Sequence, residues 1–199
     1  TKQPELLWWR NQTAGKFYNN VSQFGFDAIF YMDTDDMEDR APIDYPRDHC
    51  FIDNGLTSMH SDLVNTPRTS LYFRSGMYGS FNHTQSDINS FMIEVGGEEI
   101  AWKSGYYDTY GSTHHQNFSK TTPAHNTTTV DNGIGQPINQ FDADGRITMF
   151  LTNTDMSAAV GEGADAYMGK LGKYDRTLIY LRPDSYIVID NLAASELKK

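Results

Sequence analysis

The sequence contains a single cysteine, Cys50, among 199 residues. One thiol can form neither an internal disulfide nor a metal–thiolate cluster, so we expect Cys50 to be a small buried apolar residue. No apolar run approaches the length of a membrane-spanning helix. The Gly-x-Ser-x-Gly nucleophile elbow and the glycine-rich phosphate-binding loop are also missing. The sequence therefore gives no support to a serine hydrolase of that type, to a P-loop nucleotide-binding protein or to a membrane protein.

Basic residues are scarce, with 16 Lys and Arg against 26 Asp and Glu and a formal net charge of −10 at pH 7. A nonspecific nucleic-acid binder needs a basic face, so nucleic acid is not an expected partner. An anionic sugar remains compatible, because a few cations in a cleft can outweigh a distant acidic surface. The acidic run at 33–39 lacks the spacing of an EF-hand, and we interpret it as a solvated loop.

From about residue 50 the sequence pattern is typical of short strands separated by turn residues. Alternation is clear at Ile147, Met149 and Leu151, which would share one face of a strand. Gly96 and Gly97 separate two strand-like runs and predict a tight hairpin, and residues 182–185 predict a second hairpin. The expected strands are 50–53, 56–62, 69–75, 90–95, 98–103, 125–131, 145–153, 157–161, 173–182 and 185–192.

These patterns predict an all-β fold, mainly an antiparallel β-sandwich, over residues 46–199. A short helix is expected at 4–10, where Pro4 suits a first helical turn. Residues 1–45 would be the tail of a preceding helical domain or a linker. The chain opens without an initiator Met, and we expect it to be a mature product or a piece of a longer protein.

Polar and aromatic residues gather between residues 82 and 126, a window that holds four of the six histidines. The apolar hairpin expected at 91–102 separates the first two clusters in this window. Since the far ends of two hairpin strands lie side by side, His83 is expected near Lys103–Tyr107, in one anion-accepting pocket. The residues alone indicate a polar, aromatic, sugar-like site, and any of them could instead be ordinary scaffold.

The segments GSFNHTQSDINSF (79–91), AWKSGYYDTYGSTHH (101–115) and TTPAHNTTTV (121–130) resemble the heparinase II/III-like polysaccharide lyases. Within that family they are most similar to the exo-acting alginate and heparin lyases, which combine an α/α-toroid with β-sheets. The family pattern is His-x-His-x-Asp, a Ser-Phe strand, Asp-Ser-Gly-Tyr and a later His-Asn. Its positions map in order onto His83, Gln85, Asp87, Ser90, Phe91, Lys103, Ser104, Gly105, Tyr106, His125 and Asn126.

Two positions depart from the family pattern. In many relatives the second His, the Asp before Ser-Gly-Tyr and the later His bind zinc, and here these are Gln85, Lys103 and His125. Zinc needs three or four nitrogen, sulfur or carboxylate ligands, and a lysine ammonium cannot be one. The resemblance therefore implies a degenerate metal site without a cofactor, in which the Lys103 ammonium takes the place of the metal's charge.

The resemblance implies β-elimination on a uronate-containing polysaccharide such as alginate or heparin. That reaction must neutralise the carboxylate, remove the C5 proton and protonate the leaving O4. By analogy, His83 would be the base or charge-stabilising group, and one tyrosine, Tyr107, the proton donor. Asn82, Gln85, Lys103, Tyr106, Tyr110 and His125 would bind substrate.

The family's toroid supplies other catalytic groups, so this chain would be incomplete by itself. The main alternative is a noncatalytic carbohydrate-binding β-domain, which the changes at Gln85 and Lys103 would permit. A cupin-like metalloenzyme would need a metal triad that the sequence does not offer. The expected partner is an anionic uronate-containing polysaccharide, with a homodimer as a further option, and the family's habit implies a periplasmic or secreted protein.

Overall fold

A computed structural model describes residues 4–13, 38–65, 67–77 and 79–195. The chain divides into two compact units, residues 1–45 and 46–199. In the first unit the helix α1 spans Pro4–Thr13, as predicted, and Arg40 forms an ion pair with Glu5. Most of the acidic run at 33–39 lies outside the described residues. No described helix has the length and apolarity needed to cross a membrane.

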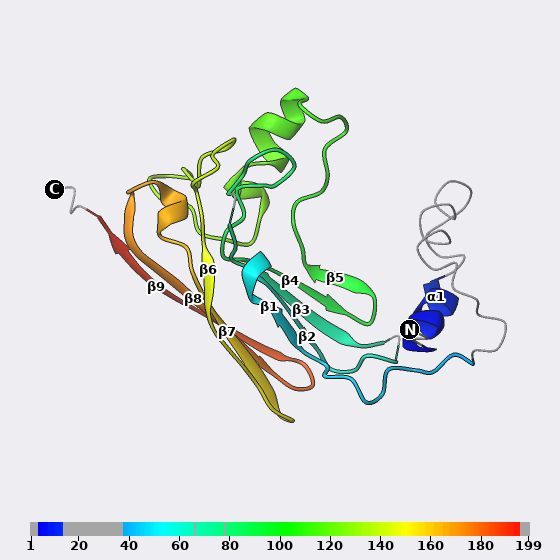
Figure 1. Cartoon of the computed structure of the whole chain (residues 1–199). Coiled ribbons are helices and arrows are strands. Elements are labelled where there is room, and N and C mark those ends of the chain that lie inside the picture. The colour runs from blue at the N-terminus through cyan, green and yellow to red at the C-terminus, as the bar shows by residue number, and fades with distance from the viewer. Residues whose placement is uncertain (1–3, 14–37, 66, 78, 196–199) are drawn as a thin grey trace. The chain divides into compact units, whose positions relative to one another are not determined.

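The second unit is a sandwich of two antiparallel sheets, which confirms the predicted fold class (Figure 1). The first sheet has the order β1-β2-β3-β4-β5, and the second has the order β6-β7-β8-β9. The strands of the first sheet are β1 (His49–Phe51), β2 (Leu56–His60), β3 (Thr69–Arg74), β4 (Ser90–Val95) and β5 (Glu98–Ala101). Those of the second sheet are β6 (Arg146–Thr152), β7 (Met156–Glu162), β8 (Leu171–Leu181) and β9 (Ser185–Ala194).

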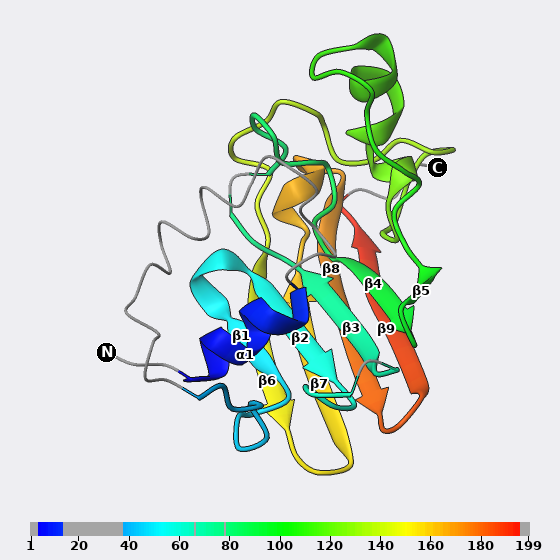
Figure 2. The same cartoon turned by 90° about the vertical axis from the view of Figure 1, so that its right-hand side faces the viewer.

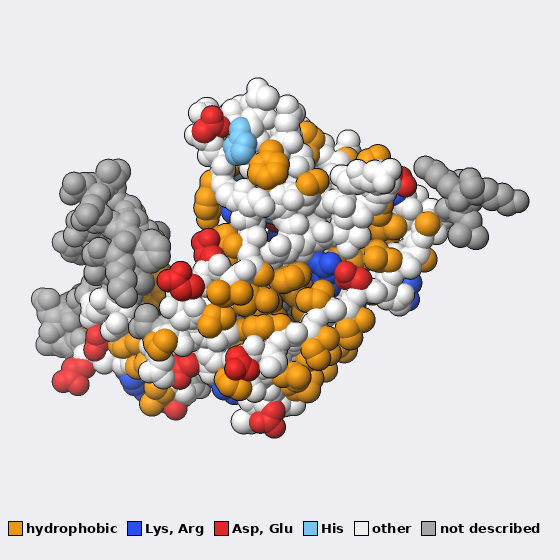
Figure 3. All heavy atoms as spheres, turned by 180° about the vertical axis from the view of Figure 1, so that it is seen from behind, with side chains coloured by type: hydrophobic (Ala, Val, Ile, Leu, Met, Phe, Trp, Pro, Cys, Tyr) orange, Lys and Arg blue, Asp and Glu red, His pale blue; other side chains and the backbone are white. Residues whose placement is uncertain are grey.

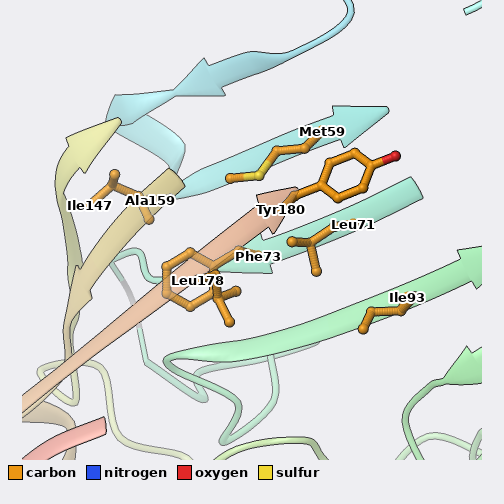
Figure 4. Packing of buried hydrophobic residues seen from close by; sticks show 8 residues of the cluster. All are labelled: Met59, Leu71, Phe73, Ile93, Ile147, Ala159, Leu178 and Tyr180. Carbon is orange, nitrogen blue, oxygen red and sulfur yellow. The ribbon is translucent and has the colours of Figure 1, made fainter. Parts of the chain in front are cut away.

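Alternation along the strands places one side of each sheet in the core. On β8, Tyr174, Arg176, Leu178 and Tyr180 are buried, whereas the residues between them are more exposed. The core cluster joins side chains of both sheets (Figure 4), namely Met59, Leu71, Phe73 and Ile93 from the first and Ile147, Ala159, Leu178 and Tyr180 from the second. Cys50 is half-buried against this cluster rather than fully buried.

Both predicted hairpins are confirmed. Gly96 and Gly97 adopt positive φ angles of 61° and 88° between β4 and β5, a conformation that glycine tolerates without strain. Residues 182–184 join β8 to β9, with Leu181 paired to Ser185. The start of β4 and the end of β5 lie at the end of their hairpin that is opposite the turn. The two long connections, residues 75–89 and 102–145, adjoin the strands there.

The prediction of a strand at residues 125–131 is wrong. Only an isolated bridge between Val130 and Ile134 forms there. The Thr127 hydroxyl donates to the Ile88 carbonyl at 2.8 Å, and the Asn126 amide donates to the Phe91 carbonyl at 3.0 Å. Short polar side chains thus bind neighbouring backbone groups, which competes with a strand ladder.

Candidate functional site

Two connections meet at one end of the sandwich and carry every candidate site residue (Figures 1 and 2). The β3–β4 connection, residues 75–89, holds Asn82, His83 and Gln85. The β5–β6 connection, residues 102–145, holds Lys103, Tyr106, Tyr107, Tyr110 and His125 and contains two helical turns, His115–Ser119 (η2) and Thr122–Ala124 (η3). In both views the segment after β5 projects beyond the sheets.

A pocket of about 220 Å³ opens where β3, β4 and the two connections adjoin. Four of the predicted substrate-binding residues line it, and they come from both connections: Gln85, Lys103, Tyr106 and His125. Arg74, Asp87, Phe91, Trp102 and Asn126 are also among its lining residues. The structure therefore gathers Gln85, Lys103 and His125, the three positions at which the resemblance implies a degenerate metal site, around one cavity.

The pocket carries one uncompensated positive charge. Arg74 forms an ion pair with Asp87, the one carboxylate in the lining, and among the described residues no ion pair includes the ammonium of Lys103. The Lys103 Nζ lies 4.0 Å from the ring centroid of Tyr106, a cation–π contact on a side chain that is 68% exposed. Partial burial lowers the pKa of Lys103, and the Asp87 carboxylate opposes that shift. An incoming carboxylate or sulfate would stabilise the ammonium further.

His125 is held in a defined tautomer. Its Nε2 donates to the Ser119 carbonyl at 3.2 Å, which leaves Nδ1 as the acceptor. Burial lowers the pKa of His125, so the ring is neutral at pH 7, although Asp87 favours its protonated form. The ring can accept a hydrogen bond from a sugar hydroxyl but adds no positive charge to the pocket.

His83 belongs to a second group, an aromatic cluster on the same end of the sandwich. Its ring centroid lies 4.4 Å from that of Tyr110, and Tyr107 and Tyr110 each contact the ring of His115, at 4.3 and 5.1 Å. The Tyr110 hydroxyl donates to the Asn82 side-chain oxygen at 3.2 Å. We define the aromatic cluster as His83, Tyr107, Tyr110 and His115. On the face drawn in Figure 3, the projecting part of this end carries a histidine with an acidic and a hydrophobic side chain next to it.

His83 does not line the pocket that contains Lys103. The expected single pocket shared by this imidazole and the Lys103 ammonium is therefore replaced by two groups, the pocket and the aromatic cluster. Tyr106 and Tyr107 are consecutive residues, one in each group, and they link the two. The hairpin geometry does bring the β3–β4 connection against the segment after β5, through the contacts that Tyr110 makes with Asn82 and His83.

Sequence reasoning missed two buried groups at this site, His115 and Lys120, both of which are 0% exposed. The His115 Nδ1 accepts the Gly111 backbone N–H at 2.9 Å, so the ring proton is on Nε2. Burial, with the nearby Lys120 ammonium as the next cause, lowers the pKa of His115 and keeps the ring neutral. The Lys120 Nζ donates to the Asn82 carbonyl and to the Asn139 side-chain oxygen, both at 2.7 Å.

Asn126 and Arg176 fix the pocket to the sandwich. The Asn126 amide donates to the carbonyls of Phe91 and Trp102, at 3.0 and 3.3 Å, and so joins the base of the β4–β5 hairpin to the His125 segment. Arg176 donates to the carbonyls of Asn89 and Asn126 at 2.7 Å each and is paired bidentately with Asp190. The walls of the pocket are therefore held by charge-assisted hydrogen bonds from the second sheet.

The donor set at this site does not fit zinc. Of the three matching positions only His125 is an ordinary ligand, and the neighbouring Asp87 is engaged by Arg74. Among the residues that the structure describes, no group of three His, Cys, Asp or Glu side chains is arranged to hold a metal ion.

The comparisons with known proteins agree with this architecture. Residues 51–199 match the family model described as heparinase II/III-like, C-terminal. No curated protein sequence matches the chain.

Solved structures share the fold at low sequence identity. A heparinase III, the BT4657 gene product, superimposes with a TM-score of 0.66 at 18% identity over 97% of this chain. The heparan sulfate lyase HepC from Pedobacter heparinus gives a TM-score of 0.65 at 17% identity over 97% of this chain. Another heparinase III gives 0.58 at 18% identity over 79% of this chain.

The chain spans about a quarter of the length of these structures, 28% of each of the first two and 24% of the third. The family model covers the whole sandwich except its first residues, including both connections that form the pocket and the aromatic cluster. The chain thus belongs to the heparinase II/III-like family, as the C-terminal β-sheet part of that architecture.

Proposed function

We propose that this chain is the β-sheet part of a polysaccharide lyase that cleaves a uronate-containing polysaccharide by β-elimination. The observation that carries the proposal is the pocket, where residues from two distant connections surround one uncompensated ammonium at Lys103. A uronate carboxylate is the matching charge. In a chain with a net charge of −10, a locally cationic pocket favours an anionic ligand over a neutral one.

The pocket would bind and neutralise the uronate carboxylate. Lys103 would pair with a carboxylate oxygen, while Gln85 and Asn82 would offer amide groups to the sugar. The exposed ring of Tyr106 and the ring of Tyr110 offer apolar faces on which a pyranose ring can pack. Neutralising the carboxylate makes the C5 proton more acidic, which is the first requirement of the elimination.

Proton transfer would fall to the aromatic cluster. His83 would act as the base or charge-stabilising group, and Tyr107 would protonate the leaving O4. Tyr107 packs against His115 and is half-buried, so its orientation is restrained. Because the chain spans about a quarter of the solved structures that it matches, we propose that groups outside this chain complete the reaction.

The site is proposed to work without zinc, with Lys103 in the place of a metal ligand. Elemental analysis of the purified protein tests this point. Stoichiometric zinc that depends on His125 would contradict it.

The test of the main proposal is a panel of uronans incubated with the full-length protein that contains this chain and assayed for unsaturated products by ultraviolet absorbance. We expect His83→Ala to lower kcat by roughly 10²- to 10⁴-fold, the usual contribution of one acid–base group. His49→Ala, an exposed imidazole on β1, is the matched control and should leave kcat unchanged. Full activity of His83→Ala would remove His83 from the mechanism.

A noncatalytic carbohydrate-binding domain is the second candidate, favoured by the exposure of Tyr106 and Tyr110. It predicts retention on the same uronan without unsaturated ends in the product. The lyase proposal predicts both retention and cleavage, so the same panel separates them. A periplasmic or secreted location is part of the proposal, since polymeric uronans are substrates outside the cytoplasm.

A further inference from the structure

Lys120 is fully buried, yet it has no charged partner. Its exposure is 0%, and both of its hydrogen-bond acceptors, the Asn82 carbonyl and the Asn139 side chain, are neutral. None of the ion pairs of the described residues includes it. Burial lowers the pKa of this ammonium. Burying a cation without a carboxylate beside it costs free energy of folding. We therefore expect the Lys120 hydrogen bonds to have a structural role that an apolar side chain could not fill.

Lys120 holds both ends of one short loop, one end through its side chain and the other through its backbone carbonyl. At one end the Lys120 Nζ binds the carbonyl of Asn82, and at the other end the Ser86 backbone N–H donates to the Lys120 carbonyl at 2.9 Å. Between these two points lie His83, of the aromatic cluster, and Gln85, of the pocket. Asn82 has a φ of +56°, a left-handed conformation in which its carbonyl is fixed by Lys120.

A third hydrogen bond, to Asn139, fixes the position of the Lys120 ammonium independently of the loop. The Asn139 side-chain oxygen accepts from Lys120, and its amide nitrogen donates to the Gln116 side chain at 3.3 Å. The Lys120 backbone N–H donates to the His115 carbonyl at 3.0 Å, at the end of η2. Lys120 is thereby anchored to the same turn that carries His115, the ring against which Tyr107 and Tyr110 pack.

We propose that Lys120 is a positioning residue that fastens the Asn82–Ser86 loop to η2 and thereby keeps the His83 ring against Tyr110. Lys120 does not touch substrate in this arrangement. The catalytic consequence rests on the proposed function of His83, whereas the placement of the loop is a property of the fold alone. The two can therefore be tested separately.

The experiment compares Lys120→Met, which keeps an unbranched side chain one atom shorter and removes its donors, with Lys170→Met. Lys170 is an exposed lysine that lines a neighbouring pocket together with Asn117 and Thr121. In each folded variant, nuclear Overhauser contacts between the His83 and Tyr110 rings are measured, with contacts in the Phe73–Leu178 core as the internal reference. We expect the His83–Tyr110 contacts to be lost in Lys120→Met and kept in Lys170→Met, with core contacts intact in both.

Activity gives the second readout. A catalytic group displaced by about 1 Å can cost roughly 10²-fold in rate, so kcat of Lys120→Met should fall by about 10- to 100-fold, with KM changing less. If Lys120→Met does not fold, Asn139→Gly, which removes one of the two acceptors at a position with a φ of +59°, should weaken the same ring contacts. Intact His83–Tyr110 contacts in a folded variant would overturn the proposal, whatever happens to kcat. Both kinetic constants are measured in the full-length protein that contains this chain. If that protein cleaves no uronan, the proposed function fails while the ring contacts still decide the role of Lys120.

Discussion

Replacing Arg182 by Met should destabilise the sandwich far more than replacing Arg146 by Met. Arg182 and Asp48 form an ion pair whose side chains are 7% and 3% exposed. The Arg146–Glu162 pair is the matched control, since its side chains are 63% and 35% exposed. Both pairs join an arginine to a carboxylate, and they differ in burial and in the hydrogen bonds that Arg182 adds to Ser157 and Asn153.

The Asp48 carboxylate ties together strands from both sheets. It accepts the His60 backbone N–H of β2 at 2.9 Å and the Ser157 hydroxyl of β7 at 2.6 Å, and the Thr152 hydroxyl of β6 binds the same carboxylate. Arg182 adds hydrogen bonds to the Ser157 hydroxyl at 2.8 Å and to the Asn153 carbonyl at 3.0 Å. Without Arg182 this carboxylate would be a buried charge with no cation beside it.

Breaking a buried pair by removing one partner costs about 3–5 kcal/mol, whereas an exposed pair contributes about 0–1 kcal/mol. For a domain of this size each kcal/mol shifts Tm by roughly 2–4 °C. We therefore expect Arg182→Met to lower Tm by about 6–20 °C and Arg146→Met by at most about 4 °C, measured by circular dichroism or calorimetry. Equal losses in the two variants would refute the reasoning.

The pH dependence of stability tests the same ion pair, because the direction of the change can be predicted. Burial opposes ionisation of Asp48, but the hydrogen bonds from Ser157, Thr152 and the His60 backbone, together with Arg182, hold its pKa below the usual range. A carboxyl with a lowered folded-state pKa contributes stability above its unfolded pKa and loses it as the pH falls through the folded value. Arg182→Met should make this loss begin at a higher pH than in the unaltered protein.

Three further predictions concern single positions. Burial lowers the pKa of His60 to about 4. The free energy of unfolding should therefore fall by roughly 3 kcal/mol as the pH drops from about 6.5 to 4. In urea titrations at several pH values, His60→Asn should make the free energy of unfolding less dependent on pH in this range. Gly135→Ala places a Cβ 2.2 Å from the Thr122 side chain and should cost about 1–3 kcal/mol, whereas Gly172→Ala meets only ordinary contacts at 3.5 Å and should cost less; equal unfolding midpoints would contradict this. Lys103→Met should raise KM for a uronan at least about tenfold and remove the salt dependence of binding, which titration at two ionic strengths would reveal.

Much of the sandwich could be predicted from the sequence because its strands alternate and its turns carry distinctive residues. Gly96 and Gly97 fixed one hairpin, and the period of two at Ile147, Met149 and Leu151 marked the position of β6. The expectation that these three residues share one face of the strand is wrong. The pairing register shifts between Ile147 and Met149, so that Ile147 is buried and Phe150 packs against the core, whereas Met149 and Leu151 are 41% and 39% exposed. The segment 125–131 misled because its run of threonines is β-branched, as strands often are. Its side chains instead bind the backbone of β4 and of the residues before it, which a local pattern does not reveal.

The site was harder to predict than the fold. The polar window from residue 82 to 126 contains the aromatic cluster and much of the pocket lining. The separation of these residues into a pocket and an aromatic cluster depends on how the long connection after β5 is folded. His114 and His115 are neighbours in sequence, yet η2 buries one and leaves the other exposed. Lys120 gave no signal, because lysine is almost always a surface residue and only tertiary contacts identify a buried one.

The outermost strand of the second sheet, β9, has a bearing on how the chain behaves in concentrated solution. Among the described strands it pairs with β8 alone, and Ile187, Val188, Ile189 and Leu192 on it are each 40–51% exposed. A long apolar strand with a free row of amide and carbonyl groups is a template for adding another strand. Pairing of β9 with the same strand of a second copy would make the chain self-associate at high concentration. The substitution Ile189→Lys is the simplest change expected to reduce such pairing.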